Sequence, residues 1–134
     1  MIKRSFLLVF IMIQLFSCKK DSEYTFSSSL IGEWSWFSTC GGLLSKCYTP
    51  ISTNKKINLV FKVDSIYNEY MNDTLSSSDR YHTYKIISAD GKEITNILKY
   101  DSGYQVAFSI IHDTLDMDDG SCCDGYRSYY SRIK

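Results

Sequence analysis

The sequence predicts an all-β protein, an eight-stranded antiparallel up-and-down β-barrel that follows an N-terminal signal peptide. Apolar and polar residues alternate from Ile57 to Val63 and again from Tyr104 to Ile110, and this period of two is typical of half-buried strands. Short turn signals such as Ala89-Asp90-Gly91 separate the apolar segments. The chain has a single proline, Pro50, and almost no helical periodicity.

The first 17 residues are organised as a signal peptide. Lys3 and Arg4 form a basic tip, and residues 6–16 are apolar except for Gln14. A stretch of this length matches a secretory signal, whereas a helix that spans a bilayer needs about 20 residues. Residues 18–29 are polar and rich in serine, so we expect a flexible tether. Residues 30–134 then form the barrel domain.

Removal of residues 1–17 leaves 117 of the 134 residues, about one domain. Lys3 and Arg4 leave with the signal, so 13 of the 15 basic residues remain against 15 acidic ones, and the net charge is −2. No basic stripe remains that could neutralise a phosphate backbone, and nucleic acid is therefore not an expected partner.

The predicted strands follow one another with short links after the first. They comprise residues 32–39, 57–63, 66–71, 81–88, 93–100, 104–110, 113–117 and 126–133. We expect residues 72–79, rich in serine and aspartate, to be a connection, and residues 39–56 to be one long connection. Closure into a barrel removes exposed edges, which favours it over the alternative, a two-sheet sandwich. At eight strands the interior is either filled by side chains or holds one small ligand.

A lipid attachment site is suggested at the end of the signal. The tetrapeptide Leu15-Phe16-Ser17-Cys18 resembles the lipobox of bacterial lipoproteins. This resemblance implies cleavage before Cys18, acylation of that cysteine, and anchoring in the cell envelope, at either face of the outer membrane. An ordinary signal peptide with a chance cysteine is the alternative. Several acyl chains anchor a protein stably, whereas one does so only marginally.

The rest of the chain resembles the small lipocalin-like lipoproteins of bacteria. The motifs, in chain order, are Leu30-Ile31-Gly32-Glu33-Trp34, Thr49-Pro50, Leu59-Val60-Phe61, Thr114-Leu115 and Asp124-Gly125-Tyr126, with Arg132 near the end of the last strand. The resemblance implies a lipocalin-like barrel over residues 30–134.

Trp34 and Arg132 should meet at the base of the barrel. In a closed antiparallel barrel the first and last strands are neighbours, so the start of one lies beside the end of the other. We expect the Arg132 guanidinium to stack on the Trp34 indole and seal the base, a contact that contributes ~0.5–2 kcal/mol. The alternative is a core tryptophan with Arg132 in solvent.

Four further cysteines, Cys40, Cys47, Cys122 and Cys123, suggest disulfides in an exported protein. Pairing Cys40 with Cys47 would leave the adjacent Cys122 and Cys123 to each other. If all four are oxidised, we therefore expect the 39–56 connection to be linked to the turn before the last strand, in an order that remains open. The spacing does not suit a structural zinc site.

Neither a metal, a cofactor nor catalysis is expected. The acidic run Asp116 to Asp124 does not follow the twelve-residue calcium loop. His82 and His112 are the only histidines, and no hydrolase elbow or phosphate loop is present. His112 and Asp113 are strand neighbours that should point to opposite faces.

Two functions from different classes are open. The barrel could bind a small hydrophobic or amphipathic ligand, with residues 41–44 beside its opening and with Tyr67, Tyr84, Tyr104 and Phe108 as candidate lining residues. Tyrosine suits such a site because it offers an apolar face and a polar tip. Alternatively, the aromatic residues fill the interior, and the domain is a structural or protein-interaction module of the envelope with an unidentified protein partner.

Overall fold

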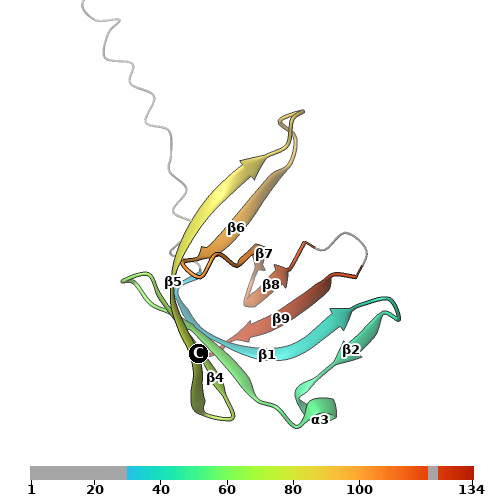
Figure 1. Ribbon diagram of the computed structural model, residues 1–134, viewed down its shortest axis with the longest axis vertical. Coiled ribbons are helices and arrows are strands. Elements are labelled where there is room, and N and C mark those ends of the chain that lie inside the picture. The colour runs from blue at the N-terminus through green and yellow to red at the C-terminus, as the bar shows by residue number, and fades with distance from the viewer. Residues whose placement is uncertain (1–29, 121–123) are drawn as a thin grey trace, which may run out of the picture.

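A closed eight-stranded antiparallel β-barrel, extended by one short strand, is formed by residues 30–120 and 124–134, which the computed structural model describes (Figure 1). The barrel strands are β1 (Gly32–Gly41), β3 (Ile57–Phe61), β4 (Ile66–Met71), β5 (Thr74–Ile87), β6 (Ile94–Tyr100), β7 (Gln105–Ile111), β8 (Thr114–Asp118) and β9 (Tyr126–Arg132). Each strand pairs with the next, and β9 returns to β1. The predicted fold class and up-and-down order are confirmed. The predicted signal peptide, Cys18, the tether, Cys122 and Cys123 lie outside the described residues.

The two ends of the barrel follow from the register of β1 and β9. Trp34 lies opposite Arg132 at one end, which we call the base, and Gly41 lies opposite Tyr126 at the other end. The links from β6 to β7 and from β8 to β9 also lie at this second end, which we call the mouth. The first described residues therefore enter at the base.

Strand β5 has 14 residues and begins seven residues earlier than the predicted strand 81–88. Residues 74–80 pair with β4, although residues 74–79 were predicted as part of a connection, and residues 81–87 pair with β6. The segment Thr74-Leu75-Ser76-Ser77-Ser78 is mostly polar and was therefore interpreted as a connection. This interpretation was wrong because a strand at a solvated opening needs few apolar side chains. The distal part of β5 and β6 extends as a hairpin away from the rest of the barrel (Figure 1).

The long connection between β1 and β3 contains structure that the sequence analysis missed. Strand β2 (Lys46–Tyr48) pairs with the end of β1, and a single helical turn, α3 (Pro50–Thr53), follows. Thr49 caps this turn, since its Oγ1 accepts from the Ser52 amide while the Ser52 Oγ accepts from the Thr49 amide. Pro50 occupies the first turn, where its missing amide hydrogen costs nothing.

The core lies inside the barrel. Trp34, Phe61, Leu59, Leu98 and Leu115 have almost no exposed surface, and their alternation along the strands places them all inside. Strand β3 ends at Phe61, two residues earlier than predicted. Val63 therefore lies in a turn, with 84% of its surface exposed.

Candidate functional site: the tyrosine-lined mouth

The base is closed by the predicted stack of Arg132 on Trp34. The guanidinium carbon lies 4.1 Å from the centroid of the indole ring, which confirms the contact. Arg132 Nη1 donates to the Ile31 carbonyl oxygen at 3.1 Å, and the Trp34 Nε1 donates to the Leu30 carbonyl oxygen at 2.9 Å. The buried indole and the cation thus both hold the chain that enters the barrel.

Gly32 is required beside this stack. Its φ of +134° is a conformation that L side chains rarely adopt, and an added Cβ would lie 2.9 Å from Arg132 Nη1. The backbone conformation and the close packing against Arg132 therefore explain the glycine in the motif Leu30-Ile31-Gly32-Glu33-Trp34.

A cavity of about 320 Å³ opens at the mouth. Every barrel strand except β1 contributes to its wall, together with the β6–β7 and β8–β9 turns. Its lining includes five tyrosines, Tyr67, Tyr100, Tyr104, Tyr126 and Tyr130, and an apolar wall of the buried Leu59 and Val106 and the partly buried Met117. Ligand pockets in proteins have volumes of roughly 300–1,000 Å³, so this cavity accommodates a small molecule only.

The aromatic side chains form a continuous series from the core to the opening. The Phe61 and Tyr67 ring centroids lie 5.2 Å apart, those of Tyr67 and Tyr100 lie 4.9 Å apart, and those of Tyr100 and Tyr104 lie 5.9 Å apart. Tyr67 and Tyr100 are buried, whereas Tyr104 is 57% exposed at the opening. The cavity wall is therefore rigid at depth and accessible at its rim.

Burial sets the protonation of these tyrosines. It raises the pKa of Tyr67 and Tyr100 far above the ordinary value and that of Tyr130 to about 12, and the charge of Glu69 adds to each rise. The three hydroxyl groups are therefore neutral in any physiological medium, and each keeps a proton to donate.

Two carboxylates of the wall accept hydrogen bonds from neighbouring groups. Glu69 on β4 accepts from the Tyr67 hydroxyl at 3.0 Å and from the Ser76 hydroxyl at 2.9 Å. Asp79 on β5 accepts from the Ser102 amide at 3.1 Å and from the Arg80 amide at 2.7 Å. Hydrogen bonding by Ser102 lowers the pKa of the Asp79 carboxyl, which is therefore charged at neutral pH.

Two of the four predicted lining residues lie elsewhere. Tyr67 and Tyr104 line the cavity as predicted. Tyr84 points to the outer face, where its hydroxyl donates to Gln105 Oε1 at 3.1 Å. Phe108 points inward but is buried in the core and does not line the cavity.

Among the lining side chains that the sequence analysis missed, six carry a phenol or a carboxylate. They are Tyr100, Tyr126 and Tyr130 and the carboxylates Glu69, Asp79 and Asp119. Strand alternation carried a signal for the tyrosines of β9, because Tyr126 and Tyr130 share the face of Arg132, which was expected to stack on Trp34 at the base. For Asp79 there was no such signal, because its strand was taken for a connection.

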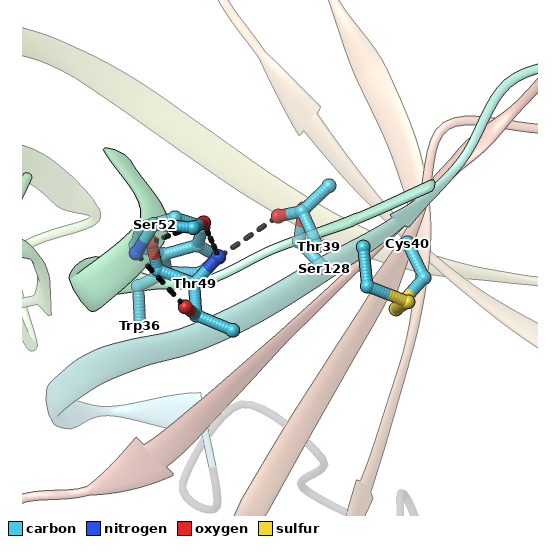
Figure 2. Close-up of a disulfide and its surroundings, with 7 residues drawn as sticks. Trp36, Thr39, Cys40, Thr49, Ser52 and Ser128 are labelled. Atoms are coloured by element: carbon cyan, nitrogen blue, oxygen red, sulfur yellow. Dashed lines mark hydrogen bonds between the residues drawn. A yellow bond between two sulfur atoms is a disulfide. The ribbon is translucent and has the colours of Figure 1, made fainter. Parts of the chain in front are cut away.

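The cysteine prediction requires a correction. Cys40 and Cys47 lie directly opposite each other on β1 and β2 and form a disulfide (Figure 2). The expected link from these two cysteines to the turn before β9 is therefore wrong. The physical reason is strand β2, which forms a tight hairpin with β1 and brings the two cysteines together locally.

Next to the disulfide, two linked hydrogen bonds connect β1 to β9. The Trp36 Nε1 donates to Thr39 Oγ1 at 2.8 Å, and the Thr39 and Ser128 hydroxyls are hydrogen-bonded at 2.8 Å (Figure 2). Gly42 follows, and a Cβ at that position would lie 2.9 Å from the Tyr126 hydroxyl. The β1–β2 hairpin therefore lies beside the mouth, as expected for residues 41–44, although Leu43 and Leu44 are themselves largely exposed.

The two histidines lie apart on the surface. His82 is hydrogen-bonded to Asp101 Oδ1 at 3.1 Å, and His112 lies at a positive φ of 54° between β7 and β8. Within residues 30–120 and 124–134, no three His, Cys, Asp or Glu side chains are grouped as metal ligands would be. In the same ranges, no helix has the length and apolar character needed to cross a bilayer.

Comparison with known protein families and with curated proteins found no match. No model of a known protein family matches the chain, and no curated protein matches it significantly. The closed antiparallel barrel itself is consistent with a lipocalin-like fold.

Proposed function

We propose that this protein is a lipid-anchored lipoprotein of the cell envelope whose lipocalin-like barrel binds a small hydrophobic or amphipathic ligand at its mouth. The observation that supports ligand binding is the cavity of about 320 Å³. In a purely structural module we would expect side chains to fill this space. An empty cavity lined by five tyrosines lacks the van der Waals contacts that a packed interior would make, and this lowers stability.

The division of the interior supports the same function. The base half is closed by packed apolar side chains and by the stack of Arg132 on Trp34. The cavity lies at the mouth, so we expect a ligand to enter and leave through that opening. Its apolar part packs on the wall of Leu59 and Val106, and its polar part meets tyrosine hydroxyls and carboxylates near the rim.

The test of ligand binding is uptake of an uncharged solvatochromic dye by the purified protein, combined with native mass spectrometry of protein isolated from its host. We expect dye fluorescence to saturate at one molecule per barrel. Ser77→Phe places a ring in the cavity and should abolish uptake. Ser78→Phe is the matched control, because Ser78 faces outward and bonds Asn68. No uptake by the wild type, or equal uptake by both variants, would contradict the proposal.

Anchoring through Cys18 rests on the lipobox resemblance of Leu15-Phe16-Ser17-Cys18. The position of the base is compatible with it, because residue 30 enters the barrel there. A tether of about a dozen residues then leaves the mouth free to face away from the membrane. Two or more acyl chains would hold such a protein at the bilayer stably.

Anchoring is tested by the intact mass of protein extracted from the membrane fraction. We expect a mature chain that begins at Cys18 and carries the mass of three acyl chains. The Cys18→Ala variant should lack that mass and should leave the membrane fraction. A wild-type chain with an unmodified Cys18 would refute anchoring and would leave the ligand-binding proposal standing.

A further inference from the structure

The cavity wall carries charge of one sign. Glu69, Asp79 and Asp119 line it, and none of its described lining residues is a lysine, an arginine or a histidine. The three carboxylates are distributed along its depth, since Glu69 and Asp79 lie on strands β4 and β5 and Asp119 lies in the turn of the mouth. The potential inside the cavity is therefore negative, and the low-dielectric walls concentrate it.

Among the lining residues, Glu69 most clearly favours a positively charged ligand. It is half-buried, lies opposite Leu59 on the inner face of the wall, and accepts hydrogen bonds from Tyr67 and Ser76. Within the described part of the chain, no lysine or arginine forms an ion pair with Glu69. Two hydroxyl groups satisfy its oxygens but do not neutralise its charge, and a half-buried carboxylate without a counter-charge is costly.

The tyrosine rings provide the second half of a cation site. Their faces carry partial negative charge and attract a cation within about 6 Å of the ring centroid. Tyr67, Tyr100 and Tyr104 lie in series beside Glu69 and Asp79. The Tyr67 hydroxyl donates to Glu69, and the Tyr67 and Tyr100 ring centroids lie 4.9 Å apart, so the carboxylate lies beside this pair of rings.

We infer that the cavity selects a small amphipathic organic cation, in which a quaternary or protonated amine meets Glu69, Asp79 and the tyrosine faces while a short apolar group packs on Leu59 and Val106. This inference rests on the proposed ligand-binding function and narrows it to one chemical class. Anionic amphiphiles such as fatty acids are disfavoured by the same carboxylates.

The test compares three ligands of one chain length by titration calorimetry on the purified protein. The ligands are hexyltrimethylammonium, hexanesulfonate and hexanol. We expect the cation to bind at least about tenfold more tightly than the sulfonate and the alcohol, because the charge interactions act in a partly desolvated site. The affinity for the cation should also fall as salt is added.

Variants that remove one carboxylate each show which residues carry the preference for a cation. Glu69→Gln and Asp79→Asn should each lower the affinity for hexyltrimethylammonium by about tenfold, and each should lower the affinity for hexanol much less, because hexanol carries no charge. Asp90→Asn, which removes a carboxylate from the β5–β6 turn far from the cavity, should change neither. Circular dichroism of each variant shows whether it is folded, and the hexanol affinity shows whether its cavity is intact.

The outcomes separate the inference from the proposed function. Equal or tighter binding of hexanesulfonate, or an unchanged cation affinity in both cavity variants, would overturn the inference. If the uncharged dye still binds in that case, ligand binding itself stands. If neither the dye nor any hexyl ligand binds, both fail together.

Discussion

The stack of Arg132 on Trp34 at the base can be measured as a coupling energy. Trp34 is fully buried, so Trp34→Ala removes a large side chain from the core and should lower the free energy of unfolding by ~3–5 kcal/mol. Arg132→Met keeps an aliphatic stem over the ring but removes the cation, whose side chain is 25% exposed. This contact should contribute ~1–2 kcal/mol, the upper part of the range for cation–π pairs.

A double-mutant cycle on these two residues isolates the contact. Urea denaturation followed by circular dichroism gives the free energy of unfolding of the wild type, both single variants and the double variant. The effects should fall short of additivity by ~1–2 kcal/mol. Lys134→Met is the control, because Lys134 carries the same charge at the base but is 83% exposed and forms a surface ion pair with Asp113. Additivity within ~0.3 kcal/mol would refute the seal.

Three further predictions concern the hairpin at the mouth and the tyrosines. The Cys40→Ser, Cys47→Ser double variant should lose about 2 kcal/mol of stability, the chain-entropy value for a short loop, and peptide mapping of the wild type should recover Cys40 linked to Cys47. Gly41→Ala should lower the melting temperature by several degrees, because its φ is +154° and a Cβ would overlap the Gly125 carbonyl oxygen; a melting temperature equal to that of the wild type would be inconsistent with this close approach. Burial raises the pKa of Tyr130 to about 12 and that of Tyr67 further, so above pH 10 the unfolded chain loses protons first, and stability should decline from pH 10 through pH 12. Absorbance at 295 nm should show these tyrosines ionising after the exposed ones, and a single transition near pH 10 for all tyrosines would contradict their burial.

The barrel could be predicted because its signals are local. Alternation in β3 and β7 and turn residues such as Ala89-Asp90-Gly91 specify strands and links without knowledge of the rest of the chain. Strand β5 could not be recognised in full, because its first half faces a solvated opening and is built from serine and threonine. Its strand character comes from pairing with β4, which is a long-range property.

The site was predicted in part, and the errors have a common cause. Tyr84 lies three positions after the inward-facing Tyr81 and therefore faces outward, but that parity becomes visible only when the register is known. Phe108 was placed correctly inside, yet whether an interior ring fills the core or lines a cavity depends on packing from several strands. Similarly, the Cys40–Cys47 pair depends on the three-residue strand β2, whose residues carry no strand pattern of their own.

The most direct test of the hollow mouth is an NMR titration of the folded protein with hexyltrimethylammonium and, separately, with hexanol. We predict that the backbone amide shifts of Leu59, Tyr67, Tyr100 and Val106 change with saturation, because these residues surround the cavity, while those around Trp34 at the closed base do not. Shifts that gather on the base or on the β5–β6 hairpin, or no shifts with either ligand, would contradict a ligand site at the mouth of this barrel.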